Sequence, residues 1–252
     1  MYEHAWLIAA FFLPLFPLGM VFNALYQRIG RAWLRISVLV LWPLAGLVLI
    51  DRTSMTIPGE LALWALFSAV LYGFRAVVIR EVNVWIGFLA TSSWSLVWVA
   101  LAAGVEARAL LIHVMAFNIP LALLMTLVNE IENRYESAYA GVVNGLAQSH
   151  PRLSGVFVIT LLAAIGSPLF PAFFAMVSNI THAAAVLPMA AIGVAVVWML
   201  WSWSGMQLLQ ELLVGPANRE QHQDMTLTRT TVYSLMLVLL VSAGLYLSEI
   251  ML

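Results

Sequence analysis

The sequence has 252 residues, of which 63% are hydrophobic and 9% are charged, and its mean hydropathy is +0.97. Soluble domains carry about 25% charged residues, so this composition excludes a water-soluble globule and indicates an integral membrane protein. Arginine supplies all eleven basic side chains, and there is no lysine. The absence of cysteine excludes disulfides and thiolate metal sites, and a net charge of −1 without a basic stripe argues against nucleic acid as a partner.

A helix that crosses the hydrocarbon core of a membrane needs about 20 apolar residues. Eight stretches of the sequence are long and apolar enough: 5–25, 33–50, 60–79, 83–103, 108–128, 153–175, 184–210 and 230–250. They leave no residues for a soluble domain. We therefore expect an all-α, polytopic transmembrane helix bundle of about eight spans, which forms one domain over 1–252 and begins with a helix pair in 1–55. Glu3 and His4, rather than a basic region, precede the first stretch, which indicates a retained helix and not a signal peptide.

The arginines are distributed unevenly over the loops between these spans. Only Arg52 and Arg108 flank the loops of one side. The other nine flank alternate loops on the opposite side: Arg28, Arg31, Arg35, Arg75, Arg80, Arg134, Arg152, Arg219 and Arg229. Because arginine-rich loops stay in the cytoplasm, we expect the N and C termini outside and a multi-pass protein of the bacterial inner (cytoplasmic) membrane.

The longest of the predicted cytoplasmic loops begins with a run of mixed charge. Its charged side chains are Glu130, Glu132, Arg134 and Glu136. Such a run suits a solvated loop, and it equally suits a docking face for a cytoplasmic partner.

Tryptophan is abundant, with ten residues. Trp42, Trp64, Trp85 and Trp98 fall near predicted helix ends or faces, where the interfacial belt of a membrane protein enriches tryptophan. Trp198 and Trp201 share a later span, where we expect packing or lipid contact rather than a ligand cage.

Few polar side chains fall at membrane depth, where they are costly and suggest function. His113 lies about a third of the way into the fifth span, and Asn118 and Pro120 follow on the same helix. Proline frees a backbone carbonyl one turn earlier, so a kink that accepts water is expected beside a histidine that can pass protons. The alternative is a neutral histidine that is hydrogen-bonded between helices.

The sixth span contains Gly166, Ser167, Pro168 and Pro171. One glycine and two prolines within six residues predict one broken helix near 166–171. Interrupted helices near the bilayer midplane recur at transport sites, because their exposed backbone groups must face water or protein. Pro14 and Pro17 predict a milder distortion in the first span.

The fourth span carries a polar run that includes Ser92 and Ser93, which suits helix packing or a hydrated path. Catalytic motifs such as HExxH, GxSxG and a phosphate loop are missing, so no catalytic residue and no cofactor is predicted. The four remaining histidines are expected on different loops, which predicts no metal site. They are His4, His150, His182 and His222.

Five segments from about residue 80 onwards carry motifs in a recognisable order. They are 88–95, similar to L-L-A-Y-S-S-I-S; 111–124, similar to L-x-H-x-x-x-H-A-x-x-K-A-x-L-F; 145–151, which matches G-L-x-x-x-x-P; 166–174, similar to G-x-P-x-x-x-x-F; and 212–216, similar to F-F-G-P. In this order they resemble the proton-translocating antiporter-like subunits shared by respiratory complex I, membrane-bound hydrogenases, multisubunit cation/proton antiporters and inorganic-carbon uptake complexes. The resemblance implies that 56–252 corresponds to the second of two inverted helical repeats and that the first repeat is missing.

The departures from this family concern its titratable residues. The basic pair of the family falls on Ile86 and Gly87, its second histidine on Phe117, its lysine on Leu121 and the charged residue after the broken helix on Met176 or a close neighbour. Only His113 remains in register. Since lysine carries protons when burial lowers its pKa and arginine stays protonated, a complete stand-alone proton pump is not expected.

The function expected from the sequence is therefore an accessory or truncated antiporter-like membrane subunit of a larger proton-coupled complex. It would contact membrane lipid and other subunits, including a cytoplasmic enzyme subunit, and supply a partial proton path through His113, Asn118, Ser92, Ser93 and Ser167. Inorganic-carbon (CO2/bicarbonate) uptake is the candidate system. A subunit of a respiratory NADH-quinone oxidoreductase-like or hydrogenase complex, and a purely structural membrane scaffold, are the alternatives.

Overall fold

The computed structural model describes residues 5–53, 57–216 and 223–251, and these residues form helices without any strand longer than an isolated bridge. The helices are α1 (Ala5–Phe12), α2 (Leu18–Arg28), α3 (Ala32–Thr53), α4 (Gly59–Val77), α5 (Val82–Ala102), α6 (Ala107–Tyr135), α7 (Leu146–Ser149), α8 (Pro151–Ala164), α9 (Pro171–Val186), α10 (Pro188–Leu213) and α11 (Leu227–Met251). The expected all-α fold is confirmed.

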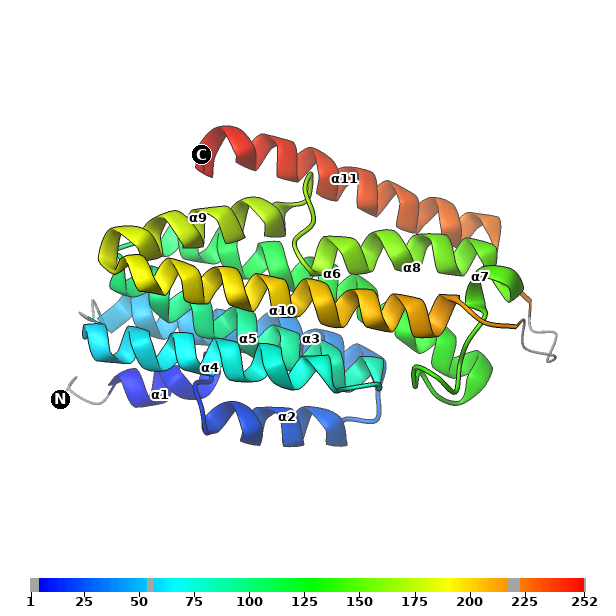
Figure 1. The fold of residues 1–252 in the computed structure, drawn as a ribbon, viewed down its shortest axis with the longest axis horizontal. Coiled ribbons are helices and arrows are strands. Elements are labelled where there is room, and N and C mark those ends of the chain that lie inside the picture. The colour runs from blue at the N-terminus through cyan, green and yellow to red at the C-terminus, as the bar shows by residue number, and fades with distance from the viewer. Residues whose placement is uncertain (1–4, 54–56, 217–222, 252) are drawn as a thin grey trace.

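Six of the described helices, α3, α4, α5, α6, α10 and α11, are long and apolar enough to cross a membrane. The remaining expected spans are interrupted. Helices α1 and α2 follow one another along the long axis of the bundle, and so do α8 and α9 (Figure 1). The eight predicted spans thus correspond to six continuous helices and two broken ones.

The first span is broken outright, so the prediction of a mild distortion over 5–25 was wrong. Helix α1 ends at Phe12 and α2 begins at Leu18, with Pro14 and Pro17 between them. Proline lacks the backbone N–H that a helix requires and clashes with the preceding turn, and two prolines three residues apart prevent the helix from resuming at once.

Side chains of other helices bind the backbone that this first break exposes. The indole nitrogens of Trp98 and Trp64 donate to the carbonyls of Leu13 and Phe16, both at 2.9 Å. The amide of Phe16 donates to the Ser68 hydroxyl at 3.0 Å. Unpaired backbone groups inside a membrane are costly, so these bonds make the break tolerable.

The second break confirms the prediction for 166–171. Gly166 has a φ of +75°, which is the left-handed conformation that glycine adopts readily. The amide of Ser167 donates to the Leu162 carbonyl at 3.0 Å, and that of Gly166 to Ala163 at 3.3 Å, the two bonds of a Schellman motif. Trp198 donates to the Ile165 carbonyl at 3.2 Å, so this break is also closed by an indole.

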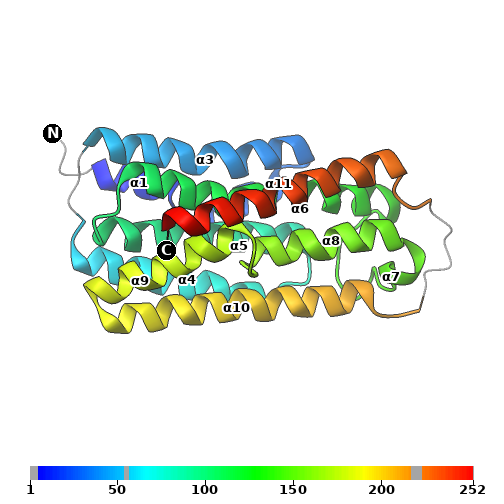
Figure 2. The same ribbon diagram turned by 90° about the horizontal axis from the view of Figure 1, so that it is seen from above.

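Helix α5 lies at the centre of the bundle, in contact with α2, α3, α4, α6, α9 and α10, and its side chains from Trp85 to Ala100 are all buried. Helix α11 lies at one edge of the bundle in Figure 1 and α3 at an edge in Figure 2, and few of their residues are buried. Helix α11 packs on α8 and α9 across the second break, where the Leu169 carbonyl comes so close to Gly244 that a Cβ there would lie 2.1 Å away.

The two ends of the bundle differ in charge. The helix ends that point towards the α7 side of the bundle in Figure 1 carry most of the arginines, whereas Arg52 and Arg108 lie near the opposite ends of their helices, α3 and α6. Arg219 lies outside the described residues. The fold thus brings the arginine-rich loops together at one end, and the assignment of that end to the cytoplasm stays a prediction.

Candidate functional site

His113 is the only histidine predicted at membrane depth, and the fold buries it between α6 and α9. Its side chain is 4% exposed. The amide nitrogen of Asn179 lies 3.3 Å from Nδ1 of the ring. Because an amide nitrogen can only donate, Nδ1 accepts, and the proton of the neutral ring is assigned to Nε2. The ring also hydrogen-bonds the backbone of Ser93 on α5, and Phe117 packs against it at 5.1 Å between centroids.

His182 joins His113 at this site, so its predicted place on a separate loop was wrong. His182 lies on α9, where its Nδ1 is 2.7 Å from the Ser178 carbonyl and 3.2 Å from the Ser178 hydroxyl. Together with His113, Ser178 and Asn179 it lines a small cavity. The volume of this cavity is about 10 Å³, which is about the room that one water molecule needs.

This histidine cavity lies near one end of the bundle. Its other lining residues come from the end of α5, the turn after it and the start of α6: Ala100, Val105, Ala109 and Leu110. Towards the bundle centre the polar lining stops, because Phe117, Leu121 and Met176 are all buried and apolar. Trp201 closes against Phe117 edge to face, at 5.2 Å between ring centroids.

The other predicted path residues of α5 and α6 are buried in separate hydrogen bonds. Asn118 accepts from the Trp94 indole at 2.9 Å, and its amide nitrogen has no partner among the described residues. Ser92 donates to the Ala69 carbonyl at 2.7 Å and accepts from the Trp201 indole at 3.0 Å. Ser93 bonds to Ala90 in its own helix at 2.8 Å. These contacts hold helices together and do not join the histidine cavity into a continuous polar chain.

Ser167 lies apart from the histidine cavity, in the second break. It is partly exposed and is followed by the exposed Pro168, whereas Pro171 begins α9 and is buried. Asn179 and His182 lie on the later turns of the same helix. The break therefore positions α9 but does not itself line the cavity with His113.

The charged run occupies the last turns of α6 and the residue after it, so its prediction as the start of a loop was wrong, and its side chains bond largely within the chain. Glu130 pairs with Arg134 at 2.9 Å and with Arg229 at the start of α11. Glu132 accepts from the Asn83 amide, and Arg134 also donates to the Gln223 carbonyl at 3.2 Å. Only Glu136 is exposed, in the left-handed residue that ends α6.

The structure offers no metal site within the described ranges, which contain no group of three or more histidines and acidic side chains. His150 lies between α7 and α8, outside the helices as predicted, and it is fully buried there, with the Tyr135 hydroxyl 3.1 Å from its Nδ1. His4 and His222 lie outside the described residues. Two imidazoles, an amide and a hydroxyl around one water site suit proton exchange, and they supply too few strong ligands for a tetrahedral metal.

The signal for Asn179 and His182 was present in the sequence but was not used. Ser178, Asn179 and His182 are spaced so that they share one face of a helix, as residues three and four apart do. The predicted span ended at residue 175, which left these residues in a loop.

Comparison with solved structures defines the class of this fold. The structure is similar to a chain of respiratory complex I from Thermus thermophilus with a TM-score of 0.87 and 20% identity, over 97% of this chain and 54% of that one. It is similar to a chain of the archaeal membrane-bound sulfane sulfur reductase with a TM-score of 0.83 and 18% identity, over 96% and 52%. A chain of the Mrp complex from Dietzia sp. DQ12-45-1b gives a TM-score of 0.81 and 17% identity, over 96% and 55%.

The chain is thus a multi-pass integral membrane protein with the fold of subunits of multisubunit membrane complexes. This confirms the resemblance to antiporter-like subunits at the level of the fold. The protein spans about half the length of the chain that it matches in each of these structures. No protein-family model matches the sequence, and no curated protein matches it significantly.

Proposed function

We propose that this chain is an accessory antiporter-like subunit of a larger proton-coupled membrane complex. In this role it anchors a partner subunit and holds a partial proton path that ends at His113. The fold supports the first part, since it occurs in chains of three multisubunit membrane complexes. The single observation that carries the second part is the histidine cavity, where His113, Ser178, Asn179 and His182 come together and which is closed inward by the apolar Phe117, Leu121 and Met176.

Reconstitution of the purified chain in liposomes tests this accessory role. We expect proton flux close to that of protein-free liposomes, because the apolar residues inward of His113 offer no proton carrier. Rapid flux that His113→Ala abolishes would contradict the proposal. Ser93→Ala serves as the matched control, since the Ser93 hydroxyl bonds only within its own helix.

Within the assembled complex the cavity is expected to matter. His113→Gln and His182→Gln should each lower proton-coupled activity at least fivefold while the complex still assembles. Glutamine keeps hydrogen-bonding atoms but does not exchange protons near neutral pH. If both variants keep full activity, the partial path is wrong.

A purely structural scaffold is the second candidate, and the closed bonds of Ser92 with Trp201 and of Asn118 with Trp94 favour it. The combined variant His113→Gln, Asn118→Leu distinguishes the two functions. Unchanged activity of the complex, together with assembly that depends on residues 129–152, supports the scaffold.

Inorganic-carbon (CO2/bicarbonate) uptake is the system we propose first for this complex. The resemblance implies a cytoplasmic zinc protein of carbonic-anhydrase type beside the membrane subunit, and a chain without lysine suits anchoring or passive proton conduction better than pumping. Glu136, Tyr139 and Val142 are exposed at the arginine-rich end and are available to such a partner. Co-purification in mild detergent tests the choice: a soluble zinc subunit supports it, and a hydrogenase or quinone-reductase arm contradicts it.

A further inference from the structure

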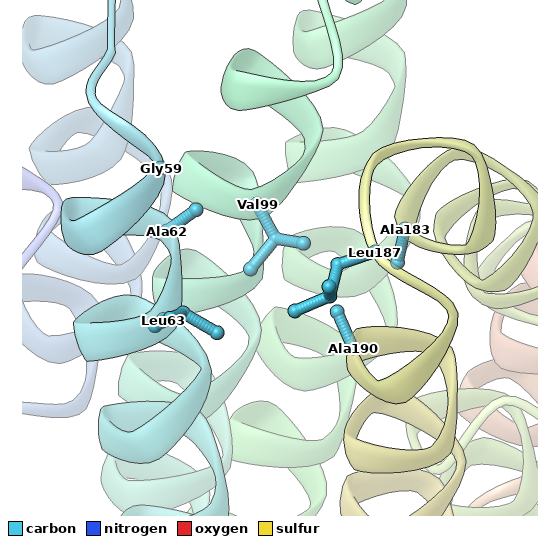
Figure 3. A pocket seen from close by; sticks show the side chains of 7 residues that line it. All are labelled: Gly59, Ala62, Leu63, Val99, Ala183, Leu187 and Ala190. Carbon is cyan, nitrogen blue, oxygen red and sulfur yellow. The ribbon is translucent and has the colours of Figure 1, made fainter.

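A second pocket lies at the same end of the bundle as the histidine cavity, on the other side of the contact between α5 and α9. Figure 3 shows it between α4 on one side and α9 and α10 on the other, with Val99 of α5 between them. Its volume is about 200 Å³. The lining residues are Gly59, Ala62, Leu63, Val99, Ala183, Leu187 and Ala190.

The lining is apolar throughout, and its residues divide into a floor and a rim. Ala62, Val99, Ala183 and Ala190 form the floor and are each at most 8% exposed. Leu63 and Leu187 form the rim and are 51% and 39% exposed. The pocket therefore has a buried floor and reaches the surface at Leu63 and Leu187.

Water is a poor occupant of this pocket, because an apolar cavity gives it no hydrogen-bond partners. An empty pocket would leave the lining side chains without contacts on one side. A cavity of about 150 Å³ with an apolar lining takes up benzene, so a pocket of this size has room for about eight carbon atoms. Hydrocarbon of that length is abundant around a membrane-spanning helix bundle.

We propose that this pocket, here called the alkyl pocket, binds one acyl chain of a bilayer phospholipid. Small floor residues make the room: alanine stands at 62, 183 and 190 on three different helices, and a leucine at any of them would narrow the space. The chain enters between Leu63 and Leu187 and reaches Val99. Ala183 is adjacent to His182, so the bound chain packs against the same turn of α9 that lines the histidine cavity.

Photocrosslinking in nanodiscs tests the proposal. The full-length protein is reconstituted with a small fraction of a phosphatidylglycerol that carries a diazirine in its acyl chain, and adducts are located by mass spectrometry. We expect adducts on 59–63 and 183–190 at least fivefold above those on Val238 and Leu239 of α11, which are 60% and 68% exposed. Even labelling of all exposed apolar faces would overturn the proposal.

Filling the alkyl pocket should remove this preference. Ala190→Leu is expected to lower labelling of the pocket at least fivefold. Ala184 is exposed on α9 and does not line the pocket, so Ala184→Leu should leave the labelling of the pocket unchanged. Ala62→Leu on α4 provides a second filling variant should Ala190→Leu fail to fold.

The same labelling in the isolated complex distinguishes a lipid from a protein occupant. Retained labelling of the pocket supports an acyl chain. Loss of labelling together with crosslinks from Leu63 or Leu187 to another subunit would assign the pocket to that subunit and overturn the proposal.

Discussion

The indole N–H is a recurrent side-chain donor of this protein, at buried and at exposed positions. Seven tryptophans donate to acceptors elsewhere in the chain: Trp42, Trp64, Trp85, Trp94, Trp98, Trp198 and Trp201. Trp85 and Trp98 are fully buried, so the prediction that they belong to the interfacial belt was wrong. A neutral indole satisfies a freed carbonyl at membrane depth without the cost of burying a charge, which makes it suitable for a bundle with two broken helices.

The neighbouring serines of α5 provide a test of this role. Ser92→Ala leaves the buried Trp201 indole without its acceptor. We expect a loss of about 1–2 kcal/mol in stability, because an unpaired buried donor costs about 1–3 kcal/mol and interhelical bonds in membranes average about 0.6. In thermal unfolding in mild detergent this corresponds to a midpoint lowered by about 2–6 °C.

Ser93→Ala is the matched control for Ser92→Ala. The Ser93 hydroxyl is equally buried but bonds only to Ala90 in its own helix, so its loss should change stability by less than about 0.5 kcal/mol. Equal effects of the two substitutions would show that burial alone, and not the bond to the indole, decides the cost.

At the scale of elements, the two broken helices are stabilised differently. The α1–α2 break depends on indole and hydroxyl groups of α3, α4 and α5. The α8–α9 break closes locally through a Schellman motif, receives one indole bond from Trp198 of α10, and is then covered by α11. The second break is therefore visible in its own sequence, whereas the support of the first comes from residues 31 to 85 positions away.

The fit of α11 on the second break depends on Gly244. In Gly244→Ala the added methyl group would meet the Leu169 carbonyl at 2.1 Å, so α11 has to move. We expect a loss of about 1–3 kcal/mol, in line with other overpacked contacts. Increased protease sensitivity of the residues around α11 in detergent would report the displacement.

Gly155→Ala on α8 is the control for this substitution. Nothing lies within 4 Å of its added Cβ, and alanine in a helix is favoured over glycine by about 0.5–1 kcal/mol. This variant should therefore be slightly more stable than the parent protein. A stable Gly244→Ala variant with unchanged protease sensitivity would show that α11 is not seated on the break.

At the scale of the whole molecule, the charged residues lie at the ends of the bundle, where ion pairs and hydrogen bonds connect them. Besides the pairs around Glu130, Arg80 pairs with Glu211 and the backbone amides of Arg152 and Leu153 donate to Asp224. Asp224 thus caps α8 from a segment 72 residues further along the chain. These contacts join α5, α6, α8, α10 and the start of α11 at the arginine-rich end.

The predicted orientation can be measured directly, because the chain has no cysteine of its own. Single cysteines are placed at Glu106→Cys, between α5 and α6, and at Val142→Cys, which is 69% exposed at the arginine-rich end. With termini outside, an impermeant maleimide should label Glu106→Cys in intact cells and Val142→Cys only after permeabilisation. The reverse pattern would invert the topology.

Features that depend on neighbours along the chain were predicted correctly from the sequence, whereas features that depend on contacts across the bundle were not. The span boundaries of α3, α4 and α5 came within three residues of the structure because hydrophobic length is a local property, whereas α6 continues to Tyr135, beyond the predicted end at 128. Residues 176–183 were missed, because α9 continues as a helix past the polar residues Ser178, Asn179 and His182. A hydropathy window ends at such residues, whereas a helix continues if their side chains find partners inside the bundle.

The sequence by itself determined the membrane class, the break near Gly166, the separation of charge between the ends and the absence of lysine. Each of these depends on residue type or on neighbours along the chain. Only the tertiary structure decided that His113 meets Asn179 and His182, that tryptophans bind the broken backbone, and that three alanines leave room for an acyl chain. These contacts join residues far apart in sequence, such as the 66 positions between His113 and Asn179. They depend on how each helix is rotated about its axis, which the packing of the whole bundle sets.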